Sequence, residues 1–174
     1  MIIPNLVANY NTMKAFLSIL LLSLSLSSCM IGVSGNGNVI EVERQVTPFN
    51  EIEASGMLEI ILVQSETGLK IVADENLHEL IETEVRGNRL MIRTTKNIKQ
   101  YKKLEVHLSS MEFAEIEVSG AVSIRSNGTI KGNDLELESS GAAEMKMSLD
   151  YDDLRCELSG ASELELKGDA RSVS

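Results

Sequence analysis

The sequence predicts an all-β fold, a parallel β-solenoid built from stacked units of about twenty residues. Four segments align without gaps on a Ser-Gly pair, and apolar and polar residues alternate within each segment. Alternation with period two is typical of strands that turn one face inward and the other outward. Aromatic residues make up 3% of the chain and tryptophan is absent, which favours a thin core of aliphatic side chains.

The Ser-Gly repeat sets the length of one unit. Successive pairs are separated by 64, 21 and 19 residues, and 64 is about three units. One unit cannot bury its own apolar face, so the units must stack. Glycine permits a backbone bend that a Cβ atom would exclude, so we interpret the pairs as structural bends, not as serine nucleophiles. The bend residues are Ser55, Gly56, Ser119, Gly120, Ser140, Gly141, Ser159 and Gly160.

The stretch 64–112 departs from the repeat. Gly87-Asn88 lies between two alternating runs, which is a hairpin signal. We therefore expect a hairpin-containing segment near 64–112 before the regular units begin. The expected elements are strands at 69–72, 81–85, 90–94 and 103–109, and one or two helical turns within 74–82.

The N-terminus has the pattern of a secretory signal peptide. Met13-Lys14 precedes an apolar run of about a dozen residues, which is too short to span a bilayer as a helix. The Leu-Ser-Ser-Cys sequence ending at Cys29 resembles the lipobox of bacterial lipoproteins, in which the cysteine sulfur is acylated. We expect a signal peptide at 1–28, with the natural start at Met13. An ordinary signal peptide with a chance cysteine and a retained membrane helix are the alternatives.

The remaining chain divides into a tether and a head. Residues 29–38 end in Gly-Asn-Gly-Asn and read as a lipid-anchored tether, and 39–174 as the solenoid head domain. Val173 lies 19 residues after Leu154, where another unit would begin. We therefore expect a C-terminally truncated chain whose exposed solenoid end can self-associate, because an uncapped solenoid exposes strand edges.

The chain is acidic, with 16 Lys and Arg against 26 Asp and Glu and a net charge of −10. Such a surface repels phosphates, which argues against nucleic acid and against a peripheral contact with anionic lipid. His78 and His107 stand alone without zinc-ligand spacing, so no cofactor is predicted. Cys156 alternates with leucines and is expected to be a buried structural thiol without a disulfide partner.

Glutamates also recur at one position of the repeat. Stacking would place them about 4.8 Å apart, where two carboxylates repel by roughly 1 kcal/mol in water. The sequence leaves two alternatives open, a solvated acidic face and a weak Ca²⁺ site. The candidate Ca²⁺ ligands are Glu53, Glu117, Glu138 and Glu157.

These units, the leader, the Gly-Asn-Gly-Asn opening and the central Val-Arg-Gly-Asn-Arg-Leu-Met-Ile run together resemble the "putative auto-transporter adhesin, head GIN domain" family. The resemblance covers about 35–174. It implies a right-handed β-helix in envelope proteins of Gram-negative bacteria, and it brings no catalytic residues. Position 30 is Met, whereas enterobacterial lipoproteins kept at the inner membrane have Asp there. By this resemblance we expect an outer-membrane lipoprotein, on either its periplasmic or its surface side.

The sequence thus predicts a non-enzymatic envelope protein, an adhesin, binding module or scaffold. Its expected partners are the membrane through the lipid anchor and a carbohydrate or an envelope protein. Two alternatives remain, a carbohydrate-active β-helix enzyme of the lyase type and an envelope-stress accessory factor.

Overall fold

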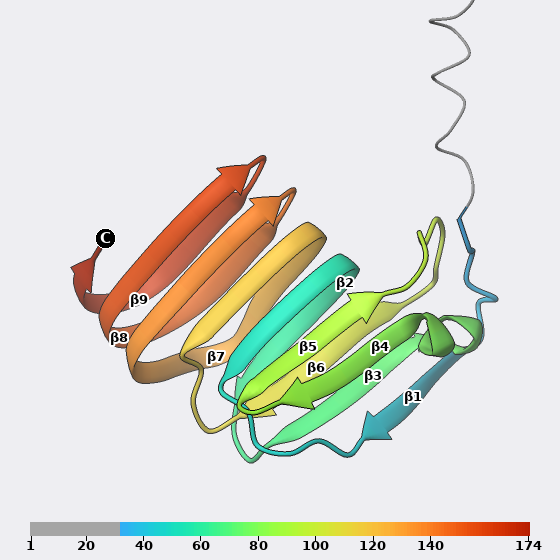
Figure 1. The fold of residues 1–174 in the computed structure, drawn as a ribbon, viewed down its shortest axis with the longest axis horizontal. Helices are drawn as coiled ribbons and strands as arrows, with labels where there is room; N and C mark the ends of the chain where they lie inside the picture. The colour runs from blue at the N-terminus through green and yellow to red at the C-terminus, as the bar shows by residue number, and fades with distance from the viewer. Residues whose placement is uncertain (1–31) are drawn as a thin grey trace, which may run out of the picture. The chain divides into compact units, whose positions relative to one another are not determined.

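A computed structural model of the protein describes residues 32–174 (Figure 1). This part of the chain forms strands and one short 3₁₀ helix, which confirms the prediction of an all-β fold. None of its helices is long and apolar enough to cross a membrane. The elements are β1 (Val39–Arg44), β2 (Glu51–Gln64), β3 (Gly68–Asp74), η2 (Glu75–Leu80), β4 (Ile81–Arg86), β5 (Arg89–Thr94), β6 (Leu104–Ser110), β7 (Glu115–Gly141), β8 (Glu144–Gly160) and β9 (Glu163–Val173).

The strands form one open sheet in the order β1-β3-β6-β2-β7-β8-β9. Outside this order, β5 pairs with β2, and β4 pairs with β5. The strands that contain the repeat, β2, β7, β8 and β9, pair in parallel. Ser55 lies opposite Ser119, and Ser140 lies opposite Ser159, so like positions of the repeat are neighbours. The antiparallel arrangement of β1, β3 and β6 was not predicted from the sequence.

Each long strand bends at its Ser-Gly pair, and the glycine there has a positive φ. Gly120, with φ of 91°, follows this rule. A Cβ atom on Gly120 would lie 2.7 Å from the carbonyl oxygen of Gly56 in the neighbouring strand. The same close approach recurs at Gly141 and Gly160, whereas a Cβ atom on Gly56 would clash with the side-chain oxygen of Thr94. We call the row of Gly56, Gly120, Gly141 and Gly160 the glycine column.

The segment 64–112 contains the predicted hairpin. β4 and β5 pair antiparallel around Gly87-Asn88, and the expected helical turns form η2. β5 then pairs in parallel with the first half of β2, and β6 with its second half. The segment therefore gives β2 a parallel neighbour on the side away from β7, where a regular unit would otherwise lie.

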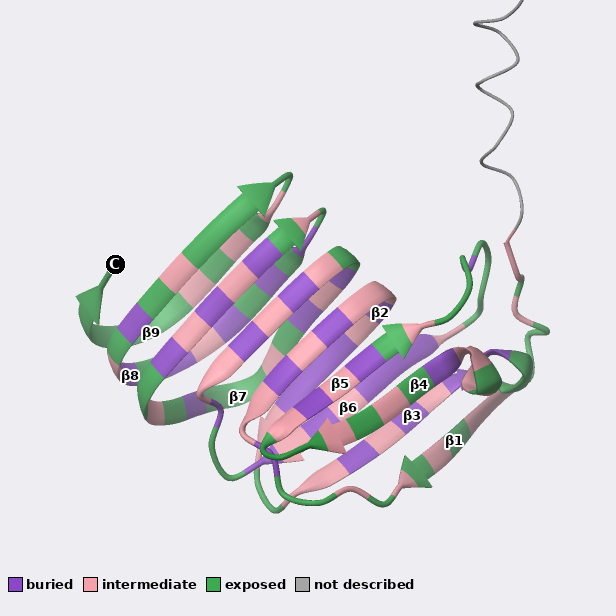
Figure 2. Cartoon of the chain, viewed as in Figure 1, coloured by how far each residue is buried: buried purple, intermediate pink, exposed green. Residues whose placement is uncertain are grey.

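The core consists of the inward-facing aliphatic residues of every strand from β2 to β8, together with Phe49 and the fully buried Phe113. Buried and more exposed residues alternate along the strands in Figure 2, whereas β9 is mostly exposed. Tyr151 fills the space beside Gly132, and its hydroxyl donates a hydrogen bond of 2.8 Å to the carbonyl oxygen of Phe113.

The stretch before β1 is bonded to the rest of the fold from Val33 on. The amide of Val33 donates to the carbonyl of Asn97 at 2.8 Å, and the amide of Gly35 donates to that of Gln100 at 2.7 Å. The amide of Gly37 donates to Asp74 at 3.2 Å. Of the predicted tether at 29–38, residues 33–38 therefore lie against the domain.

We expect Gly120→Ala to destabilise the protein more than Gly128→Ala. Both glycines have a positive φ, near 90°, but only at Gly120 would the new Cβ meet another strand, since nothing lies within 4 Å at Gly128. The conformational cost is about 1–2 kcal/mol in each variant, and Gly120→Ala must in addition push two strands apart. Urea unfolding of the two variants gives the difference, and equal losses would contradict a steric role for the glycine column.

We expect Tyr151 to make the stability of the fold sensitive to alkaline pH. Burial, helped by the charge of Glu112, raises the pKa of Tyr151 to about 12. Because the pKa is about 10 in an unfolded chain, the stabilisation is complete below pH 10 and is lost between pH 10 and 12. Over that range the protein should lose about 2–3 kcal/mol more than Tyr151→Phe does. Parallel losses in chemical denaturation of both proteins would refute the assignment.

Candidate functional site

One outward face of the sheet presents its side chains in straight rows that cross β5, β2, β7 and β8. The rows follow from the parallel register and from the amide of Glu136, which donates to the carbonyl of Ala114 and so brings the second half of β7 beside the first. We call this surface the glutamate face. Its rows are Ser55, Ser119, Ser140 and Ser159; Glu53, Glu117, Glu138 and Glu157; and Glu51, Glu115, Glu136 and Arg155.

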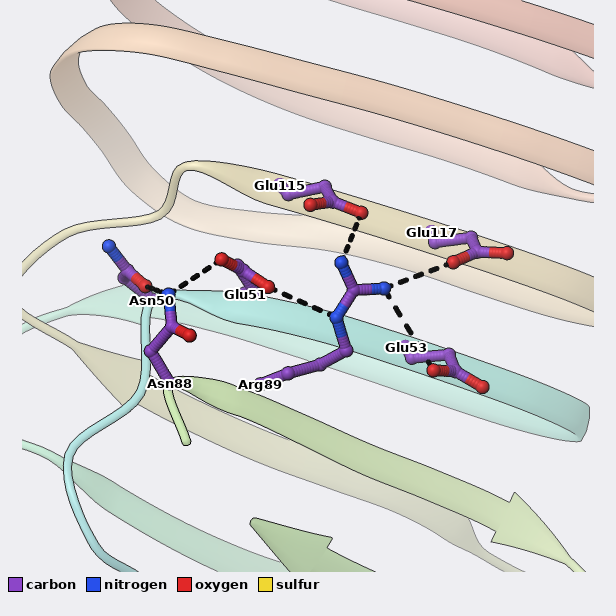
Figure 3. A network of polar contacts seen from close by, with 7 residues as sticks. All are labelled: Asn50, Glu51, Glu53, Asn88, Arg89, Glu115 and Glu117. Carbon is purple, nitrogen blue, oxygen red and sulfur yellow. Dashed lines mark hydrogen bonds and ion pairs between the residues drawn. The ribbon is translucent and has the colours of Figure 1, made fainter. Parts of the chain in front are cut away.

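Arg89 of β5 lies at one end of the glutamate face and joins four carboxylates (Figure 3). Its Nε lies 3.0 Å from Glu51, and its two terminal nitrogens lie 2.7 Å from Glu115 and 3.2 Å from Glu117. Glu53 is 3.9 Å away. Partial burial lowers the pKa of Arg89, but hydrogen bonds and charge from Glu51 and Glu115 outweigh this and raise it overall. The guanidinium thus offsets the repulsion between two neighbouring strands of the row.

The far end of the face is held by a second arginine. Arg155 lies 3.3 Å from Glu136 and also binds Glu157. Glu138 lies between these groups and, among residues 32–174, has no cation within 4.0 Å of its carboxylate. Desolvation raises the pKa of Glu138, and the charges of neighbouring glutamates raise it further. Glu117, Glu138 and Glu157 line a shallow groove of about 250 Å³.

A second ionic cluster lies around Glu105 of β6, whose side chain is 10% exposed. It contacts Lys103 at 2.7 Å, His107 at 3.0 Å and Arg125 at 3.2 Å. Burial alone would raise the pKa of Glu105, but hydrogen bonds from Lys103 and His107 outweigh it, so the pKa is lowered. This cluster ties β6 to β7 across β2, and we interpret it as structural.

The predicted site residues have different outcomes. Cys29 lies outside the described residues. The eight Ser-Gly residues lie side by side at the bends, and Ser159 donates to the backbone of Ser139 at 3.1 Å. Cys156 is half-buried, less than expected, and burial raises the pKa of its thiol.

The four candidate Ca²⁺ ligands do form one row, and two of them, Glu53 and Glu117, contact Arg89. Within residues 32–174 no three His, Cys, Asp or Glu side chains are grouped so that they could hold a metal ion. The Ca²⁺ site therefore stays a prediction from the sequence.

The sequence reasoning missed Arg89 and Asp74. Arg89 could have been found by pairing the predicted hairpin with the strand at 51–55, since equal parity places it beside Glu51. Asp74 is fully buried, and one carboxylate oxygen accepts hydrogen bonds from the amides of Gly37 and Lys102. No local pattern marks such a residue, because its two partners lie 37 and 28 positions away in the chain.

Comparison with models of protein families identifies the family of this chain. Residues 48–174 match the family described as "putative auto-transporter adhesin, head GIN domain". The chain belongs to this family. The suspected resemblance is thus confirmed, and an adhesin-like family implies a protein of the cell envelope or surface. A search of curated proteins finds no match.

Several solved structures have a fold similar to that of this chain. A "putative adhesin" from Bacteroides fragilis has a TM-score of 0.77 at 24% identity, over 82% of this chain and 68% of that one. A "putative lipid binding protein" from Parabacteroides distasonis has a TM-score of 0.62 at 22% identity, over 79% of this chain and 70% of that one. A "putative adhesin" from Parabacteroides merdae has a TM-score of 0.59 at 24% identity, and the chain covers 64% of its length. At these identities the likeness concerns the fold alone.

We expect Arg89→Gln to destabilise the protein by about 1–3 kcal/mol, because it leaves partly buried carboxylates without a counterion. Arg86→Gln is the matched control, since Arg86 forms an exposed pair with Glu84. Exposed pairs contribute about 0–1 kcal/mol. Thermal unfolding at low and high salt measures both variants. An Arg89→Gln variant as stable as the control would show that the four contacts do not matter.

Proposed function

We propose that the chain is a non-enzymatic, adhesin-type binding module of the envelope, anchored to the outer membrane through lipid on Cys29. Membership of the adhesin-like family supports the binding role. The observation that carries the proposal is the glutamate face. On this face, equivalent residues of neighbouring strands lie side by side and form rows across the sheet. Neighbouring strands lie about 4.8 Å apart, so a partner meets a regular, rigid array. An array of this kind suits repeated weak contacts with a large partner.

The finer architecture belongs to the same proposal. We infer that the units wind as a right-handed β-solenoid. Its support is the parallel pairing of β7, β8 and β9 at an offset of 19 residues, as for Leu135 with Leu154 and Leu154 with Val173. In such a fold each added unit extends the face without changing it.

The polar groups of the face favour binding over catalysis. A serine nucleophile needs a base within hydrogen-bond reach, about 2.6–3.2 Å. His107 instead contacts Glu105, and His78 lies 3.3 Å from the carbonyls of Ile40 and Ala73. At both ends of the face the glutamates form ion pairs with arginines, so these charges stabilise the fold.

We expect attachment by cells that carry the full chain to depend on the glutamate face. Glu138→Lys/Glu157→Lys reverses the charge of two neighbouring carboxylates of the face and should reduce attachment to host-cell layers and to glycan-coated surfaces severalfold. Glu144→Lys/Glu163→Lys makes the same charge change in a different row of β8 and β9 and should leave attachment unchanged. Surface labelling confirms equal display of all variants.

The competing functions give different results in the same strains. Normal attachment of a deletion strain, together with new sensitivity to envelope stress, would favour the stress-accessory role and contradict the adhesin proposal. Cleavage of acidic polysaccharides by the purified full chain would favour a lyase.

A further inference from the structure

The positive charge of this acidic protein is distributed unevenly. Four of its 16 Lys and Arg residues lie in the nine residues 95–103, Thr-Lys-Asn-Ile-Lys-Gln-Tyr-Lys-Lys, which contain no Asp or Glu. We call this segment the basic loop. It connects β5 to β6. Lys96, Lys99, Tyr101 and Lys102 are exposed, and Tyr101 is one of the few large apolar side chains that face solvent, at 43% exposure.

The basic loop is fixed to the domain, although Lys96, Lys99 and Lys102 are exposed. Ile98 is 3% exposed and packs into the core. On both sides of Ile98 the backbone bonds to Val33, through the carbonyl of Asn97 at 2.8 Å and the amide of Lys99 at 2.9 Å. The loop thus presents its lysines on a defined surface.

Asp74 holds the same corner together. Its buried carboxylate accepts the amide of Gly37 from the N-terminal stretch and the amide of Lys102 from the basic loop. Its own amide donates to the carbonyl of Lys103 at 3.2 Å. Figure 1 shows the start of the described chain beside the loop between β5 and β6. The loop and the point where the chain enters the domain are therefore one surface.

The sequence gives the distance from this surface to the anchor. Only three residues separate Cys29 from Val33. Four extended steps span at most about 14 Å. If Cys29 carries lipid, Val33 and the adjoining basic loop must stay close to the headgroup layer. This step rests on the anchor of the proposed function.

We propose that the basic loop is a membrane-contact element that binds the anionic headgroups of the bilayer in which Cys29 is anchored. Lysines near an anionic surface each strengthen binding about fivefold. Tyrosine favours the boundary between headgroups and acyl chains, because its ring is apolar and its hydroxyl polar. The contact fixes which end of the sheet faces the membrane.

The net charge of −10 does not oppose this contact. Charges separated by more than about 8 Å are largely screened at physiological salt. Near the loop, Glu105 is bound by Lys103, His107 and Arg125, and the buried carboxylate of Asp74 accepts two backbone amides. The exposed Glu75 accepts a hydrogen bond from Asn38. The membrane therefore meets the local positive charge first.

The absence of tryptophan allows a direct test on the full chain. A Tyr101→Trp protein, purified with its native processing, is reconstituted into vesicles of phosphatidylglycerol and phosphatidylcholine that contain brominated lipid. We expect strong quenching and a blue shift for Trp at 101, and neither for Met111→Trp, an exposed reporter in the turn after β6. Adding Lys96→Gln/Lys102→Gln should lower the ratio of docked to free loop about 25-fold. Lys131→Gln/Lys167→Gln, with the same charge change on β7 and β9, should have no effect.

The outcomes separate the contact from the anchor. Mass spectrometry of the N-terminal peptide reports acylation of Cys29, and its absence would overturn the anchor alone, because soluble protein can still be tested for binding to the same vesicles. Quenching that is equal in pure phosphatidylcholine, or that persists in roughly 0.5 M NaCl, where the Debye length is about 4 Å, would overturn the headgroup contact. A response to soluble polyglutamate or inorganic phosphate but not to vesicles would assign the loop to a different anion and also overturn the proposal.

Discussion

The close approach of consecutive units at the glycine column constrains the rest of the structure. At Gly120, Gly141 and Gly160 a Cβ atom would lie 2.5–2.7 Å from a backbone oxygen of the preceding unit, so only glycine fits in register. A strand shifted by one residue would bring a side chain against that backbone. The unit length can still vary, because the turns absorb the difference. Paired residues of β7 and β8 are 21 positions apart in the chain up to Arg125, and 19 positions apart from Thr129 on. The bend fixes the register, and the turns on the other side tolerate two extra residues.

A fixed register has an electrostatic consequence. Equivalent residues of a repeat must stack, so a glutamate that is harmless in one unit becomes part of a row of like charges. The structure relieves this at both ends of the glutamate face, with Arg89 on β5 and Arg155 on β8. Neither arginine lies in the interior of a row, and Glu138, which forms an ion pair with neither of them, has a raised pKa. Further glutamates could be added only together with further cations.

The strands and bends of the repeat could be predicted because their signals are local: alternation, the Ser-Gly pair and the Gly87-Asn88 turn each lie within a few residues. The partners of the unrepeated strands could not. Nothing in the sequence of β1 specifies that it pairs antiparallel with β3, since any strand with suitable alternation could take that edge. Arg89 and Asp74 act on residues more than 25 positions away, and the ionic cluster around Glu105 depends on β2 lying between β6 and β7. A net charge averages over the whole chain, so it does not reveal a local basic segment such as residues 95–103.

This separation of charge makes membrane contact and overall acidity compatible. The basic loop lies beside Val33, whereas the glutamate face runs across β2, β7 and β8 toward the β9 end of the sheet. With the loop on an anionic surface, the glutamates are held away from that surface, where repulsion is screened. With the glutamate face turned to the membrane, several uncompensated carboxylates would come within a Debye length of it. Attraction at the loop and repulsion at the face therefore favour the same orientation, in which the repeated strands point away from the membrane and remain accessible to a partner.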